Sequence, residues 1–79
     1  MSLSGIIKQT RQKLFMSQED FALTINVSVA TINRWENGRS KPNLIAMKSI
    51  KAFCEKNELP FEEIEIEWRK YSAKECKNG

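Results

Sequence analysis

The chain has 79 residues, of which 41% are hydrophobic and 29% are charged, and it carries a net charge of +3. This length suits one domain with a single hydrophobic core. No apolar run approaches the ~20 residues that a membrane-spanning helix needs. The N-terminus lacks the pattern of a secretory signal peptide. We therefore expect a cytoplasmic protein without a membrane segment.

The reactive residue types argue against an enzyme. The chain has two cysteines, Cys54 and Cys76, and no histidine, so we expect no metal site, no cofactor and no activated thiol. Cys54 lies among apolar residues, which favours burial as a small hydrophobic side chain. The acidic run over residues 62–67 lacks a lysine or histidine to complete a hydrolytic site, so a solvated helix face is the favoured interpretation.

Charge is unevenly divided along the chain. Residues 1–51 hold eight basic and three acidic side chains (+5), whereas residues 52–79 hold five basic and seven acidic ones (−2). A polyanion would therefore dock on the N-terminal part, if one docks at all.

The N-terminal part reads as two helices. Apolar residues recur at three- and four-residue spacing from Leu3 to Leu14, which predicts a helix over about residues 3–14. Ser17-Gln18-Glu19-Asp20 is typical of a capping box and predicts a second helix over about residues 18–25. Its expected buried residues are Phe21, Ala22 and Ile25.

A third helix follows after a tight turn. Asn26 tolerates the left-handed conformation that ends helices. Ser28 is a good N-cap for a helix over about residues 29–37, and Gly38 supplies its end. Residues 39–42 then form a loop.

The C-terminal part reads as two more helices. Asn43 is expected to cap the fourth, whose apolar residues are Leu44, Met47, Ile50, Phe53 and Cys54. Pro60 suits the first position of the fifth. Residues 64–68 also alternate with period two, so a strand added across a dimer is the alternative; a helix is favoured because no partner strand lies nearby. We expect one domain over residues 1–74 and a flexible tail over residues 75–79.

The predicted third helix has two contrasting faces. At ~100° per residue, one side carries Ser28, Ile32, Trp35 and Glu36, and the other carries Ala30, Asn33, Arg34 and Asn37, with Val29 at the rim. The first side should pack on the preceding helices. The second is short and polar with one arginine, and such a surface can approach base edges in the major groove of DNA.

Residues 6–64 resemble the helix-turn-helix domain shared by phage repressors, Cro proteins and XRE-type regulators. The matching residues are Arg11, Ser17-Gln18-Glu19, Ala22, Asn26-Val27, Ser28, Ile32, Trp35-Glu36-Asn37-Gly38 and Lys41-Pro42. The resemblance implies an all-α fold, a compact five-helix domain like that of lambda repressor. It leaves about residues 65–79 unexplained.

The resemblance also implies residue roles. Gln18 would bond a backbone phosphate, Val29, Ala30 and Arg34 would read bases beside Asn33, and the loop would contact phosphates. Arg11 and Glu36 match an internal ion pair. For each surface residue the alternative is an ordinary solvated side chain. The expected DNA-binding residues are Gln18, Ser28, Val29, Ala30, Asn33, Arg34, Asn37, Arg39 and Lys41.

We therefore predict a sequence-specific binder of double-stranded DNA, a small prokaryotic or phage transcriptional regulator and most simply a repressor. Two copies would bind half-sites about one helical turn apart, as a homodimer. The candidate dimer residues are Phe61, Ile64, Ile66, Trp68 and Tyr71. The alternative is an antitoxin or adaptor that binds a protein partner, such as a toxin, through its C-terminal helix. The chain could also be one domain of a longer protein.

Overall fold

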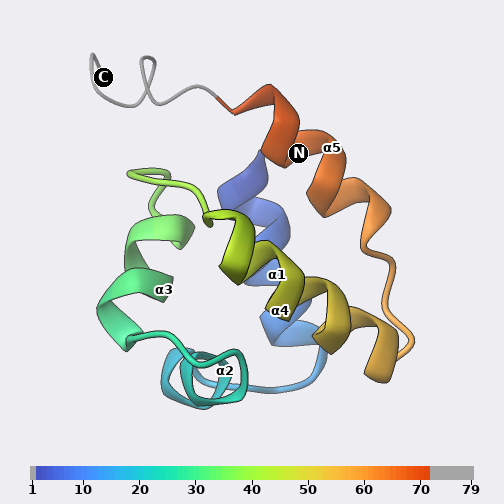
Figure 1. Cartoon of the computed structure of the whole chain (residues 1–79). Coiled ribbons are helices and arrows are strands. Elements are labelled where there is room, and N and C mark those ends of the chain that lie inside the picture. Colours follow the sequence, from blue (N-terminus) through green and yellow to red (C-terminus); the bar gives the residue numbers. More distant parts are fainter. Residues whose placement is uncertain (1, 72–79) are drawn as a thin grey trace.

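The computed structural model describes residues 2–71 and contains five α-helices (Figure 1). They are α1 (Leu3–Lys13), α2 (Gln18–Thr24), α3 (Val29–Glu36), α4 (Leu44–Lys56) and α5 (Glu62–Lys70). No strand occurs within these residues, so the all-α prediction is confirmed, and residues 64–68 are helical. The predicted tail over residues 75–79 lies outside the described residues, as does Cys76.

Side-chain caps start the first four helices, at Ser17, Ser28 and Asn43 as predicted and at Ser2, which was not predicted. Ser17 Oγ accepts from the N–H of Asp20, and Asp20 Oδ2 accepts from the N–H of Ser17, which makes a complete capping box. Ser28 Oγ accepts from the N–H of Thr31 at the start of α3. These bonds satisfy N–H groups that have no acceptor within the helix.

Left-handed residues follow the first four helices and make the turns. Asn26 has φ of 60° and Gly38 has φ of 72°, in agreement with their predicted roles. Phe15 and Glu58 adopt similar angles, 56° and 55°, at turns that the residue types did not predict. Both are non-glycine residues in a region that normally costs L-amino acids energy.

The start of the fifth helix was predicted wrongly. α5 begins at Glu62 rather than Pro60, and Phe61 precedes it without a side-chain cap. Leu59 and Phe61, on either side of Pro60, both pack against the core, whereas side chains two residues apart point in different directions on a helix. Acidic residues in the first turn of α5 complement its dipole.

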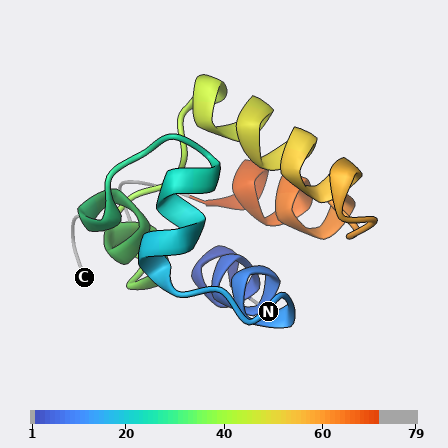
Figure 2. The same cartoon turned by 90° about the horizontal axis from the view of Figure 1, so that it is seen from below.

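Every helix contributes to one core. The rings of Phe21 and Phe53 meet edge to face at 5.2 Å and join α2 to α4. α1 contacts both α3 and α5, while α2 contacts α3. In Figures 1 and 2, α4 and α5 run side by side on one flank, and α2 and α3 form the other. None of the described helices has the length and hydropathy needed to cross a membrane.

Candidate nucleic-acid interface

α2, a tight turn and α3 form a two-helix unit. The N–H of Val27 donates to the carbonyl of Ala22 at 2.9 Å, and the left-handed Asn26 reverses the chain. Ile25 is buried at the end of α2 and fixes the turn against the core. The unit therefore holds α3 at a set angle across α2.

α3 has the two faces that the sequence predicts. Ile32 and Trp35 are buried in the core, at 0% and 3% exposure. Val29, Ala30 and Arg34 face solvent. Their side chains are small except for the arginine, so the helix backbone can approach a flat surface closely along this face.

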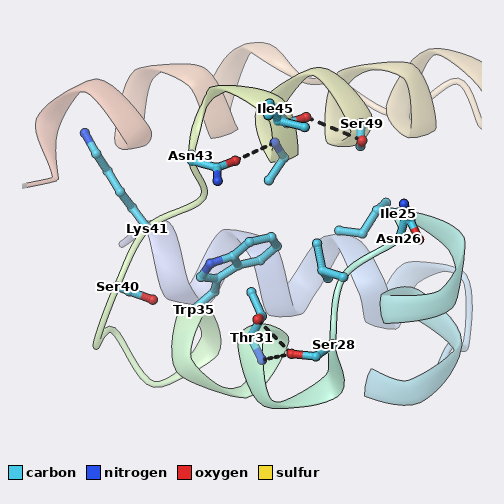
Figure 3. A pocket seen from close by; sticks show the side chains of 12 residues that line it. Ile25, Asn26, Ser28, Thr31, Trp35, Ser40, Lys41, Asn43, Ile45 and Ser49 are labelled. Carbon is cyan, nitrogen blue, oxygen red and sulfur yellow. Dashed lines mark hydrogen bonds between the residues drawn. The ribbon is translucent and has the colours of Figure 1, made fainter.

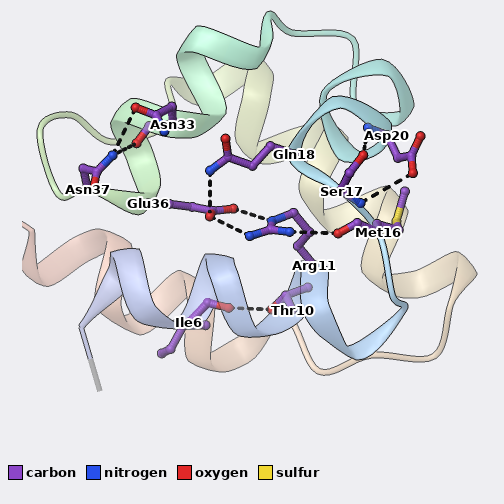
Figure 4. Close-up of polar contacts among 10 residues, drawn as sticks. All are labelled: Ile6, Thr10, Arg11, Met16, Ser17, Gln18, Asp20, Asn33, Glu36 and Asn37. Carbon is purple, nitrogen blue, oxygen red and sulfur yellow. Dashed lines mark hydrogen bonds and ion pairs between the residues drawn. The ribbon is translucent and has the colours of Figure 1, made fainter.

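Two asparagines at the end of the exposed face are paired with each other. Asn37 Nδ2 donates to the carbonyl oxygen of Asn33 at 2.8 Å and to its Oδ1 at 3.1 Å (Figure 4). The pair fixes both amides while leaving Asn33 Nδ2 as a donor and Asn37 Oδ1 as an acceptor. This pairing across one helical turn was not predicted.

The acidic residue of α3 is turned inward and neutralised. Arg11 from α1 donates to Glu36 through Nε (2.7 Å) and Nη2 (2.9 Å), and its Nη1 donates to the carbonyl of Met16 (Figure 4). The side chains are 11% and 4% exposed. The hydrogen bond from Arg11 to Glu36 raises the pKa of the guanidinium, against the opposing effect of burial. The outer face of α3 therefore carries no acidic charge.

Gln18 lies next to this ion pair rather than extending into solvent. Its Nε2 donates to Glu36 Oε1 at 3.0 Å. Its backbone N–H stands at the first position of α2, where a helix leaves N–H groups without an intrahelical acceptor.

The loop after α3 holds two basic residues in different environments. Arg39 is exposed and takes part in no salt bridge within residues 2–71. Lys41 is partly buried, and its Nζ lies 4.3 Å from the ring centre of Trp68 on α5. Of the two basic residues expected to contact phosphates, Arg39 is therefore the one whose charged group is more available to DNA.

A pocket of about 480 Å³ lies behind α3, between that helix and the start of α4 (Figure 3). Trp35 lines it from α3, Ile45 and Ser49 from α4, and Ser40 and Lys41 from the loop. Sequence patterns did not predict this pocket, because its walls come from separate segments. In the loop that carries Arg39, the N–H of Arg39 donates to the carbonyl of Arg34 on α3 at 2.9 Å, and Pro42 is buried at the other end.

The predicted dimer residues lie mostly against their own chain. Ile64 is 1% exposed and belongs to the core, so it is unavailable to a partner. Phe61, Trp68 and Tyr71 are partly buried and also pack on the core. Ile66 alone of the five is an exposed large apolar residue, at 49%.

Other exposed apolar side chains were not identified from the sequence. Leu44 and Ile45, in the first turn of α4, are 68% and 76% exposed. Leu44 follows the helical spacing of the buried residues, but it precedes the part of α4 that reaches the core. Phe15 and Leu23 are 96% and 80% exposed. Leu44 and Ile45 lie at the end of a helix, whereas Phe15 lies in the turn after α1 and Leu23 on the outer side of α2.

A two-helix unit with an exposed polar helix defines a helix-turn-helix domain, a DNA-binding class. Residues 7–57 match the helix-turn-helix family model, and the chain belongs to this family of phage-repressor, Cro-like and XRE-type domains. The family is a DNA-binding one rather than a catalytic one.

Among curated proteins, the chain is similar to the type II methyltransferase M.SsoII of Shigella sonnei, with 35% identity over 52 residues. The matched segment covers 62% of this chain and 14% of that protein. No solved structure matches the chain.

Proposed function

We propose that the chain is a sequence-specific reader of double-stranded DNA that acts as a small prokaryotic or phage transcriptional regulator, with α3 in the major groove. The observation that carries the proposal is the division of charge on α3. Arg34 faces solvent, whereas Glu36 on the same helix is buried against Arg11. A helix arranged in this way presents a positive charge and no negative charge to a polyanion.

Some residues on and around α3 would contact bases, and others would contact the phosphate backbone. Arg34 is long enough to reach a guanine edge, and Val29 and Ala30 are small enough to contact thymine methyl groups. Asn33 donates beside them, and Ser28 begins the helix. Phosphate contacts are assigned to the N–H of Gln18, to Asn37 and to the loop after α3. Such contacts fix the docking register but carry no sequence information.

Repression by a homodimer is the favoured form of this activity. One copy of α3 covers only a few base pairs, and a two-fold pair on adjacent half-sites doubles the contacts. The apolar residues available for self-association are Ile66 on α5 and the exposed pair Leu44 and Ile45 on α4.

The antitoxin or adaptor alternative has less support. It relied on the apolar residues of the C-terminal helix being available to a toxin. Ile64 is buried, and Trp68 and Tyr71 pack against the chain's own core. Within the described residues, the apolar surface that α5 leaves to a partner is Ile66 and the parts of Phe61 and Trp68 that line a pocket of about 290 Å³ between α4 and α5.

The proposal is tested by selecting bound duplexes from a randomised library, at low and moderate salt. The wild type is compared with Arg34→Ala and with Arg69→Ala, a matched loss of charge from an exposed arginine on α5. We expect the wild type and Arg69→Ala to enrich the same two-fold symmetric site. Arg34→Ala should lose about 1–3 kcal/mol of discrimination at one position in each half-site. Salt-sensitive binding without any enriched sequence would contradict the proposal.

A further inference from the structure

The last turn of α5 holds both ends of the loop that follows α3. Trp68 Nε1 donates to the carbonyl oxygen of Pro42 at 2.6 Å, and the hydroxyl of Tyr71 donates to the carbonyl oxygen of Gly38 at 3.3 Å. Trp68 lies in the last turn of α5 and Tyr71 is the residue that follows the helix, and both side chains reach the loop. The two acceptor residues bracket residues 39–41.

Lys41 strengthens the same junction from the side of the loop. Its ammonium group lies over the ring of Trp68, 4.3 Å from the centre, and 3.5 Å from the carbonyl oxygen of that residue. In Figure 3 the side chain extends away from the loop, on the side of α5. The Trp68 carbonyl lies in the last turn of α5, where a positive charge is favourable to the helix dipole. The positive charge of Lys41 therefore interacts with Trp68 of the same chain.

We infer that the end of α5 is a positioning element for the DNA-backbone contact made by this loop, with Trp68 and Tyr71 as positioning residues and Arg39 as the contact. The inference rests on the proposed function. It gives a role to a helix that lies beyond residues 7–57, the segment that matches the family model.

The physical basis is the conformational freedom of the loop. Residues 39–42 are in no helix, and Ser40 and Lys41, between Arg39 and the buried Pro42, line the pocket behind α3. A loop that is free in solution must lose conformational entropy when a phosphate binds it. Two hydrogen bonds at its ends remove that freedom in advance, so Arg39 is held where it can meet the backbone.

A double-mutant cycle between α5 and Arg39 tests the inference. The variants are Trp68→Phe, Tyr71→Phe and Arg39→Ala, and the two pairings of each aromatic change with Arg39→Ala. The measured quantity is the dissociation constant for the duplex that the wild type selects. Arg69→Ala, on the same helix, serves as the control.

We expect Trp68→Phe to weaken binding about three- to tenfold, since it removes one hydrogen bond that orders the loop. In the Arg39→Ala background the same change should cost less than about twofold, because the contact that the loop positions is already absent. Tyr71→Phe should show the same non-additivity at smaller size. It deletes only a hydroxyl group, so it keeps the test valid if Trp68→Phe disturbs the fold.

The outcomes distinguish a failure of the inference from a failure of the proposed function. Equal losses in both backgrounds, or no loss from either aromatic change, would overturn the inference while DNA binding by the wild type still stood. A wild-type protein that binds no duplex would overturn the proposed function and the inference with it. Faster hydrogen exchange at the amides of residues 39–41 in Tyr71→Phe, at unchanged melting temperature, would support the inference independently of DNA.

Discussion

The carboxylate of Glu36, in the last turn of α3, is bound by the guanidinium of Arg11 through two hydrogen bonds of 2.7 and 2.9 Å. Gln18 donates a third bond to the same carboxylate. These three residues belong to α3, α1 and α2, so one carboxylate joins the helix that would read bases to both helices beneath it (Figure 4). The pair sets the orientation of α3 more than it adds stability.

Breaking this pair should be costly. We expect Glu36→Ala to lower the free energy of unfolding by about 3–5 kcal/mol, because it leaves the positive charge of Arg11 buried without a partner. Chemical denaturation monitored by circular dichroism measures the change.

The chain contains a matched control. Arg69 and Glu65 form an exposed pair on α5 at 2.8 Å, and Glu65→Ala should cost less than about 1 kcal/mol. Replacing both buried partners, as Arg11→Met with Glu36→Leu, should restore much of the lost stability, since no unpaired charge remains. Similar losses for the buried and the exposed pair would show that burial is not the cause.

Features within one helix or turn were predictable from the sequence. Caps such as Ser17 and Ser28, the turn at Asn26 and the two faces of α3 depend on residues three or four positions apart, and their preferences are local. The sequence could therefore indicate five helices and the residues that α3 exposes.

Contacts between distant segments were not predictable in the same way. Lys41 and Trp68 are 27 residues apart, and Gln18 and Glu36 are 18 apart. Whether such side chains face solvent depends on how the helices pack, which no local pattern specifies. The expectation that Trp68 serves a dimer had the same weakness, because an apolar stripe on α5 does not say which surface covers it.

Cys54 provides a pH-dependent test of the core. Burial raises the pKa of its thiol above the ordinary value of 9.0, and the nearby charge of Glu55 adds to the rise while Lys13 opposes it. The unfolded chain therefore loses this proton at a lower pH than the folded chain does. The associated stability is fully present below about pH 9 and is lost as the pH rises through the pKa of the folded state.

The expected result is a steeper fall in the free energy of unfolding above pH 9 for the wild type than for Cys54→Ala. The difference between the two slopes should not exceed about 1.4 kcal/mol per pH unit, the limit for one proton. Denaturation under reducing conditions at a series of pH values measures both curves. Parallel curves for the two proteins would mean that the thiol ionises equally in the folded and unfolded chains.

Two isoleucines on α5 separate its structural role from any role in association. Ile64 is 1% exposed and Ile66 is 49% exposed, and they are two residues apart on the same helix. Ile64→Ala should lower the free energy of unfolding by about 2–5 kcal/mol, because it leaves a cavity in the core. Ile66→Ala should change the stability of the monomer by less than about 0.5 kcal/mol.

The pair of variants is informative because both make the same chemical change in the same helix. Thermal unfolding at several protein concentrations distinguishes their effects. If Ile66 belongs to a dimer interface, Ile66→Ala should lower the melting temperature only where the wild type self-associates, since binding stabilises the folded state by mass action. A large, concentration-independent loss for Ile66→Ala would instead place that side chain in the core, and little loss for Ile64→Ala would show that α5 is not part of the folded unit.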